Sequence, residues 1–212
     1  MKVIGISSSG RKNSYSTRLI QDIFSEVEGE TELIRLAGKQ INGCLGCLQC
    51  AKDNICVQQD DFQEVLQRVM DADALVFAGP NYYNSLNALG LAFWERTFCL
   101  RHQDRFLLAG KLAVAIGLDR TEKGAAYSHI EKMMKSNKMA IVDSISNPGN
   151  YQCYDCGFGH ECIAGNVYAR QGLCTKECAE TNRPLEYNED KEAVKKVKAI
   201  GKELNAILQA RK

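Results

Sequence analysis

Four closely spaced cysteines are the residues of this sequence best suited to chemistry. They form the motif Cys44-x2-Cys47-x2-Cys50-x5-Cys56, with neutral residues between the first three. Spacings this short let several thiolates meet at one iron–sulfur cluster. Thiolates so close together repel one another unless a cation or a cluster neutralises them. We therefore expect a metal centre in this segment.

Two alternatives to an iron–sulfur cluster stay open for this first cysteine group. A structural zinc site also takes four cysteines, but its ligands usually come as two well-separated Cys-x2-Cys pairs. Here three thiols fall within residues 44–50, which favours a cuboidal cluster. The other alternative is a loop of free or redox-active thiols.

A second group of cysteines lies in residues 148–184, a region without clear hydrophobic periodicity. Its members are Cys153, Cys156, Cys162, Cys174 and Cys178. Such a region needs something to fold around, so we expect a second metal centre, of iron–sulfur or zinc, held by the first three and Cys174. Cys178 or His160 are alternatives for the fourth ligand. Disulfides or reduced buried thiols are alternatives to the whole centre.

Composition and charge bound the remaining possibilities. The 212 residues suit one domain with an appendage, and their formal net charge of +1 gives no argument for nucleic acid or an anionic membrane. No apolar run is long enough to span a bilayer. Lys2 leads straight into a strand-like run, unlike a signal peptide, so we expect a cytoplasmic protein with reduced thiols. Cys99, between Phe98 and Leu100, is expected to pack in the core.

Strand-like and helical patterns alternate along the chain. This order predicts an α/β fold, a doubly wound, flavodoxin-like parallel sheet of five strands in the order 2-1-3-4-5. We expect residues 1–147 to form a ligand-binding domain of this fold that includes a cysteine loop at 42–58. Residues 148–184 form a cysteine-rich extension, and residues 185–212 a helix that packs on the same domain. The expected strands are 2–7, 30–36, 74–78, 112–117 and 139–145, and a helix is expected over about 87–100.

Ligands of such folds bind beyond the carboxyl ends of the strands, so three loops are candidate binding segments. The loop after the first strand combines hydroxyls, backbone N–H groups and a cation at a helix start, which suits a monophosphate such as that of FMN. A plain polar turn is the alternative. Its candidate residues are Ser7, Ser9, Arg11, Asn13, Ser14, Ser16 and Thr17.

The loop after the third strand suits a flat heteroaromatic ring, because its tyrosines can stack and its amides can reach ring nitrogens and carbonyls. The alternative is that the tyrosines pack at the rim of the core. Its candidate residues are Pro80, Asn81, Tyr82, Tyr83 and Asn84. The charged loop 118–124, with Asp119 as its candidate, could close over a ring edge.

These motifs resemble those of the NAD(P)H-dependent FMN reductase branch of the flavodoxin-like proteins, and more narrowly the iron–sulfur flavoproteins of anaerobes. Residues 9–14 stand where that family has a Ser-Pro-Arg-type phosphate loop, with Gly10 in place of the usual proline. The cysteine motif 44–56, followed by Asp60-Asp61, is similar to the family's compact cysteine motif. Residues 79–83 resemble its Ser-Pro-x-Tyr-Tyr flavin loop, and residues 119–124 occupy the place of a third flavin-side loop.

The resemblance implies FMN at the first two loops and a [4Fe–4S] cluster held by Cys44, Cys47, Cys50 and Cys56. It implies electron transfer between them, with the cluster of one subunit near the flavin of another, and hence a homodimer or homotetramer. NAD(P)H or a ferredoxin-like protein is the expected donor. No acid–base or nucleophilic residue is required for such a relay.

Two other functions remain open at this point. One is an NAD(P)H-dependent FMN or quinone reductase without a cluster. The other is a zinc-stabilised binding module.

Overall fold

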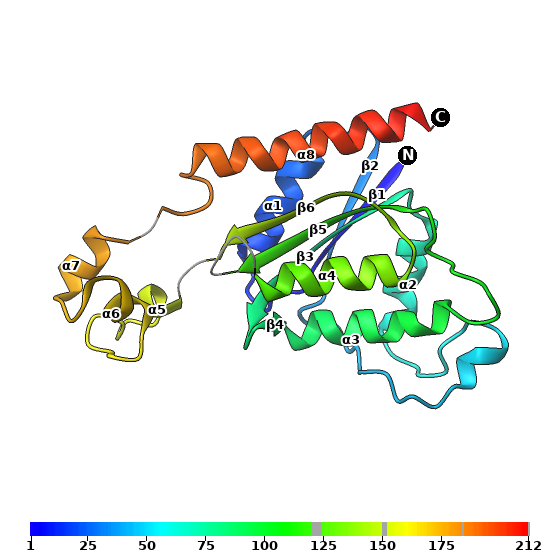
Figure 1. Cartoon of the computed structure of the whole chain (residues 1–212), viewed down its shortest axis with the longest axis horizontal. Coiled ribbons are helices and arrows are strands. Elements are labelled where there is room, and N and C mark those ends of the chain that lie inside the picture. The colour runs from blue at the N-terminus through cyan, green and yellow to red at the C-terminus, as the bar shows by residue number, and fades with distance from the viewer. Residues whose placement is uncertain (120–123, 150–151, 184, 212) are drawn as a thin grey trace.

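Five parallel strands form the sheet at the centre of the molecule (Figure 1). The computed structural model describes residues 1–119, 124–149, 152–183 and 185–211. The strand order is β2-β1-β3-β5-β6, and the short β4 (Ser85–Leu86) pairs antiparallel with β3. Without β4 this is the predicted order 2-1-3-4-5, and the flavodoxin-like fold is confirmed. The parallel strands are β1 (Lys2–Ser7), β2 (Glu30–Arg35), β3 (Ala74–Tyr82), β5 (Leu112–Asp119) and β6 (Ala140–Pro148).

Helices cover both faces of the sheet, and each face has its own hydrophobic core. Helices α1 (Tyr15–Phe24) and α8 (Lys191–Ala210) pack on one face, and α2 (Phe62–Asp71), α3 (Ala88–Arg96) and α4 (Ala125–Ser136) on the other. In β1, Val3 belongs to the first core while Ile4 and Ile6 belong to the second. Successive side chains of a strand point to opposite faces, so a sheet covered on both sides needs continuous apolar runs.

Several element boundaries differ from the sequence-based expectation; among them, β2 ends at Arg35 and β5 runs on to Asp119. Strand β3 continues through Pro80 to Tyr82, because an extended backbone accommodates the fixed φ of proline and the Pro80 carbonyl accepts a hydrogen bond from Asn87 N. The expected helix over 87–100 ends at Arg96 and gives way to the 3-10 segment η2 (Thr97–Leu100). Strand β6 begins at residue 140 and runs on to Pro148.

The segment 152–183 extends away from the sheet as a separate lobe at its left end in Figure 1. It contains the short helices α5 (Gln152–Asp155), α6 (Asn166–Gln171) and α7 (Lys176–Thr181). The chain then returns to the sheet, where Val197, Ile200 and Leu204 of α8 share a core with α1. Among the described helices, none combines the length and the apolar character that crossing a bilayer requires.

Phe93 stands at the centre of the aromatic part of the core, and its removal tests that packing. Its ring lies 5.8 Å from those of Phe62 and Phe77 and 5.4 Å from that of Trp94. We expect Phe93→Ala to lower the free energy of unfolding of cofactor-free protein by about 3–5 kcal/mol, measured by urea denaturation. The control Phe158→Ala removes a ring that is 72% exposed and should change it little. Equal losses for both variants would contradict this account of the core.

Candidate functional site

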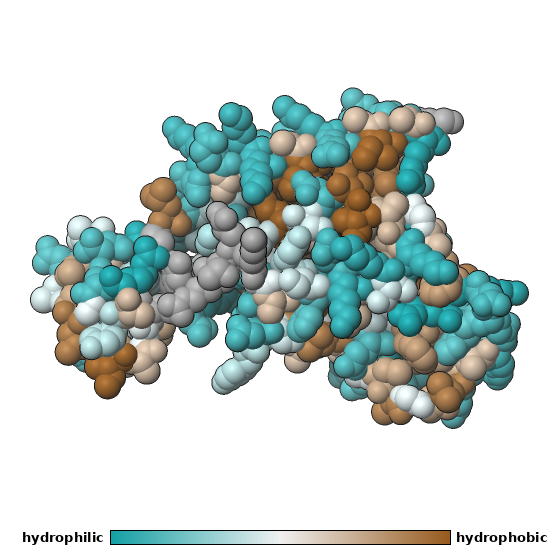
Figure 2. Space-filling model, in the orientation of Figure 1, coloured by the Kyte–Doolittle hydropathy of each residue, from teal (hydrophilic) through white to brown (hydrophobic). Residues whose placement is uncertain are grey.

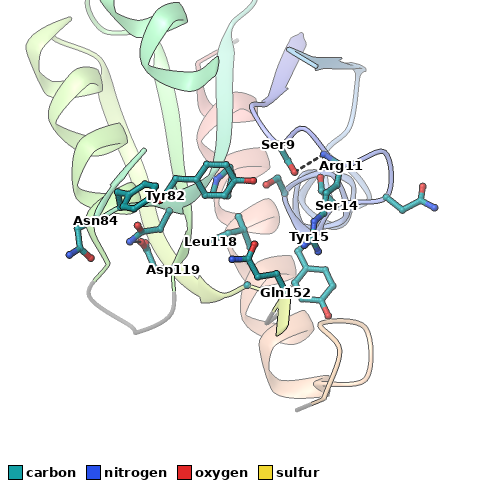
Figure 3. A pocket seen from close by; sticks show the side chains of 15 residues that line it. Ser9, Arg11, Ser14, Tyr15, Tyr82, Asn84, Leu118, Asp119 and Gln152 are labelled. Carbon is teal, nitrogen blue, oxygen red and sulfur yellow. Dashed lines mark hydrogen bonds between the residues drawn. The ribbon is translucent and has the colours of Figure 1, made fainter. Parts of the chain in front are cut away.

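A cavity of about 370 Å³ lies at the carboxyl ends of β1, β3 and β5. Figure 3 shows Ser9, Arg11, Ser14 and Tyr15 on one side of it, with Tyr82, Asn84 and Asp119 on the other. Of the residues predicted from the sequence for this site, Ser7 and Thr17 do not line the cavity. Those that line it are Ser9, Arg11, Asn13, Ser14, Ser16, Pro80, Asn81, Tyr82, Tyr83, Asn84 and Asp119.

The amino end of α1 forms the first side of this cavity. Ser14 caps the helix, since its hydroxyl accepts a hydrogen bond from Thr17 N at 3.2 Å. Ser9 Oγ accepts another from Arg11 N at 3.3 Å. The first turn of a helix carries unpaired N–H groups and a partial positive charge, so hydroxyls and N–H donors converge here on a place that suits a phosphate.

Strands β3 and β4 form the second side as a tight hairpin. Tyr83 and Asn84 occupy its two turn positions with φ of 52° and 56°, the left-handed region that a type I′ turn requires. Asparagine adopts this conformation easily, but tyrosine does so only under strain. The turn leaves the Tyr83 side chain fully exposed at the rim and Tyr82 half-exposed. The two aromatic rings are thus available to a ligand rather than to the core.

A buried hydrogen-bonded pair ties the two sides together. Ser8 Oγ donates to Asn87 Oδ1 at 2.7 Å, and Asn87 Nδ2 donates to the Ser8 carbonyl at 2.6 Å. Gly79 and Gly90 leave room for this pair, since a Cβ at either would meet Ser8 Oγ. This pair therefore fixes the position of the loop after β1 relative to the hairpin.

Asp119 organises the third side of the cavity. Its buried carboxylate accepts hydrogen bonds from Asn81 Nδ2 at 2.7 Å, from Ala126 N at 3.0 Å and from Tyr127 N at 3.2 Å. It thereby caps α4 and fixes the hairpin at once. Gly124 is required beside it, since a Cβ there would overlap the carboxyl group. Residues 120–123 of the predicted third loop lie outside the described part of the chain.

Four lining residues were not found by sequence reasoning, namely Tyr15, Leu118, Gly149 and Gln152. Gly149 and Gln152 come from the segment that leads into the cysteine-rich extension, and no local signal marked it as a wall of this cavity. The same segment contacts Arg11, whose Nη1 lies 3.1 Å from Asp155 Oδ2. Asp155 also binds Arg183 at 2.6 Å, so this carboxylate shares its charge between two cations.

The first cysteine group lines a second, smaller cavity. Cys44, Cys47, Cys50 and Cys56 all border it, together with Arg96 and Phe98. Gly46 lies at φ of 63°, and its N–H donates to Cys44 Sγ at 3.4 Å. The Nε2 atom of His102 lies 3.2 Å from Cys50 Sγ. Sequence spacing identified the four thiols, but it gave no sign of the arginine and the histidine.

The guanidinium of Arg96 holds this cysteine loop in place. The side chain has no exposed surface, and it binds Asp60 through Nη1 at 2.7 Å and Nη2 at 3.2 Å. Its Nη1 also donates to the Asn42 carbonyl, and its Nε to Cys56 Sγ at 3.1 Å. The Phe62 ring packs 4.6 Å beneath it. A single buried cation thus joins both ends of the loop to α2 and α3.

The thiols of this cavity influence one another. Burial raises the pKa of the Cys50 thiol, and the nearby Cys56, Cys44 and Cys47 raise it further. Cys99 also borders the cavity but is buried in the core, as expected, and burial raises its pKa to about 12. Cys99 therefore stays a neutral thiol.

No three His, Cys, Asp or Glu side chains of the described residues converge as a single ion would require. Cys44, Cys47, Cys50 and Cys56 nevertheless line one cavity, as the ligands of a single metal centre must.

Asp119→Ala should weaken both the fold and the ligand site. The change leaves the buried donors Asn81 Nδ2, Ala126 N and Tyr127 N without their acceptor, at a cost of about 1–3 kcal/mol in unfolding free energy. We expect a rise in the FMN dissociation constant in a fluorescence titration, and a smaller rise for Asp119→Asn, which keeps the side-chain shape. An unchanged FMN affinity in both variants would contradict the organising role of Asp119.

The Asp60–Arg96 pair predicts a pH-dependent contribution to stability. Burial raises the pKa of Asp60, but hydrogen bonds from Arg96, Asn42 N and Phe62 N outweigh it and lower the pKa below its ordinary 3.8. The stabilisation is therefore complete above pH 3.8 and is lost as the pH falls through the lower, folded-state pKa. We expect Asp60→Asn to cost cofactor-free protein about 3–5 kcal/mol near neutral pH, and less in acid. Urea denaturation across this pH range measures both; a cost that is constant with pH would refute the pairing.

Comparisons with known proteins support the fold and the family. An iron–sulfur flavoprotein of Methanocaldococcus jannaschii is 32% identical over 136 residues, which are 63% of this chain and 69% of that protein. One of Archaeoglobus fulgidus is 31% identical over 132 residues, 60% of each chain, and one of Methanosarcina thermophila is 26% identical over 155 residues, 70% and 81%.

Solved structures share the fold at low identity. An azoreductase of Bacillus anthracis has a TM-score of 0.57 and 12% identity, with 95% of this chain and 99% of that one covered. An archaeal flavodoxin has a TM-score of 0.53 and 13% identity, with 99% of both chains covered.

Residues 1–150 match the family of NADPH-dependent FMN reductases. This segment contains the strands, the first two candidate loops and the first cysteine group. The chain therefore belongs to the NADPH-dependent FMN reductase family, in the branch of the iron–sulfur flavoproteins, and is a flavin-dependent oxidoreductase.

Proposed function

We propose that this protein transfers electrons between FMN, bound in the larger cavity, and a [4Fe–4S] cluster held by Cys44, Cys47, Cys50 and Cys56. The observation that carries the proposal is that all four thiols border one cavity in a chain with a separate, flavin-sized cavity at the strand ends. FMN exchanges hydride or single electrons, and so links two-electron donors to one-electron carriers.

The residues around the cysteine cavity suit a cluster of thiolates. The N–H of Gly46 and the Nε of Arg96 donate toward the sulfurs of Cys44 and Cys56, and His102 reaches Cys50. Such donors and a buried positive charge stabilise the added electron of a reduced cluster, and so set its potential. Thiolate ligation also requires a reducing compartment, which favours the cytoplasm.

The larger cavity suits FMN in one orientation. The hydroxyls of Ser9, Ser14 and Ser16 at the amino end of α1 would bind the phosphate. The hairpin residues Tyr82 and Tyr83 at the opposite side would contact the ring, with Pro80, Asn81 and Asn84. Asp119 is committed to its own hydrogen bonds, so it positions the hairpin instead of binding the ligand.

Two subunits would complete the electron path. Arg96, at the carboxyl end of α3, lines the cysteine cavity. Asn87, at the amino end of α3, binds Ser8, which is next to Ser9 of the flavin-type cavity, and a helix of nine residues spans about 14 Å. The cysteine loop exposes four apolar side chains, Leu45, Leu48, Ile55 and Val57. Figure 2 shows hydrophobic patches among polar ones at the lower right, where this loop lies in Figure 1. We propose that this surface contacts another copy in a homodimer or homotetramer, near its flavin. NAD(P)H or a ferredoxin-like protein is the proposed donor.

Purification without air tests this function. The expected protein contains FMN, iron and acid-labile sulfide, and shows a broad brown absorption under the flavin bands that dithionite bleaches. Flavin without iron would instead support a reductase without a cluster. Zinc without flavin would support a binding module and overturn the proposal.

Cys47→Ala separates the two cofactors. The variant should lose the brown absorption and the iron that this cluster contributes yet keep FMN, because the sites share no lining residue. Cys99→Ala is the matched control, a cysteine of the same cavity that is no ligand, and should keep both. Joint loss of flavin and iron in Cys47→Ala would show that the sites are not independent.

A further inference from the structure

The cysteine-rich lobe, residues 152–183, has almost no hydrophobic core. Its buried apolar residues are Tyr154, Val167 and Ala179, with Cys153 and Cys174 packed against them. The helices α5, α6 and α7 have four to six residues each, too short to be stable alone. So small a core does not offset the entropy of ordering this lobe, and segments of this kind need disulfides or a metal. Cys156, Cys162, Cys174 and Cys178 form no disulfide.

The segment Cys153-x2-Cys156 has the form of a thiolate-binding turn. Cys156 N closes the short α5 by donating to the Gln152 carbonyl at 3.0 Å. Gly157 then reverses the chain at φ of 82°, which favours glycine. This reversal brings Phe158 N to within 3.4 Å of Cys156 Sγ, as a donor. A backbone N–H that donates to sulfur stabilises its anionic form.

The other cysteines of the lobe gather near this turn. A Cβ at Gly165 would lie 3.4 Å from both Cys153 Sγ and Cys162 Cβ, so these two cysteines border the same glycine. Cys174 packs on the same small core as Cys153, and its N–H donates to the His160 carbonyl, two residues before Cys162. The Gln171 amide donates to Cys174 Sγ at 3.3 Å. The four cysteines thus come from three segments that contact one another in the lobe.

We propose that Cys153, Cys156, Cys162 and Cys174 bind a second metal centre through thiolates, either a zinc ion or an iron–sulfur cluster. The described residues present no closed ion site, so the ligands close around the metal as it binds and the lobe folds with it. Cys156 and Cys162 are exposed and can turn toward the metal at little packing cost. The Cys178 thiol is hydrogen-bonded to that of Cys174. It stays outside the proposed ligand set, because Cys174 is the one that packs on the small core beside Cys153.

This centre would lie at the wall of the larger cavity in the same chain. Gln152, which precedes Cys153, lines that cavity, and Asp155 binds Arg11 of the loop opposite. Metal binding would therefore order one wall of the flavin-type cavity. The first cysteine group, by contrast, lies at the other end of α3. The inference rests on the lobe alone and does not require the proposed function.

Metal analysis of the full chain purified without air tests the centre. We compare wild type with Cys156→Ser/Cys162→Ser, with Cys47→Ala, which affects only the first group, and with the neighbouring control Cys178→Ser. The double variant should lose one centre, seen as about one zinc or as a matched set of iron and sulfide. Cys178→Ser should lose none. Equal metal content in wild type and the double variant would overturn the proposal, as would loss in Cys178→Ser.

Limited proteolysis gives a second readout that does not depend on a variant folding. A strong chelator should raise tryptic cleavage after Arg170 or Lys176 by roughly tenfold or more, while cleavage after Arg68, in the packed helix α2, stays unchanged. The double variant should be cleaved at that higher rate without chelator. Cleavage that chelator leaves unchanged, or alkylation that finds Cys174 joined to Cys178 by a disulfide, would refute the metal centre.

Discussion

A buried guanidinium is the interaction on which the cysteine loop depends. Arg96 has no exposed surface, and a charge taken out of water is tolerated only when its partners satisfy it fully. Asp60 binds it with both oxygens, and the Asn42 carbonyl and the Cys56 sulfur each accept a hydrogen bond from one more of its N–H groups. The hydrogen bonds of this one cation therefore hold the cysteine loop in place, although the loop has little hydrophobic core of its own.

Helix α3 connects this constraint with the flavin-type cavity. Its amino end carries the Ser8–Asn87 pair that joins the two cavity loops, and its carboxyl end carries Arg96. A packed helix is rigid, so it sets the separation of the two sites. The aromatic contacts of Phe93 and Trp94 with the sheet fix the helix in turn.

Much of the architecture was predictable because it follows from local hydrophobic patterns. Continuous apolar runs marked the buried strands, and the alternation of elements gave the doubly wound sheet. The β3–β4 hairpin was missed, since Tyr83-Asn84 lacks the glycine that usually signals such a turn. The strained tyrosine is held there by tertiary contacts, including the bond from Leu86 N to His129 Nδ1. In this turn, tertiary contacts outweigh the intrinsic backbone preference of tyrosine.

The sequence by itself determined the sheet order, the two cysteine groups and most residues of the cavity at the strand ends. These features depend on spacing and on the rule that parallel strands present their carboxyl ends at one edge. Only the tertiary structure decided that Arg96 and His102 face the thiols and that Gln152 borders the other cavity. Those contacts join segments far apart in the chain, and the burial that selects their partners exists only once the chain has folded.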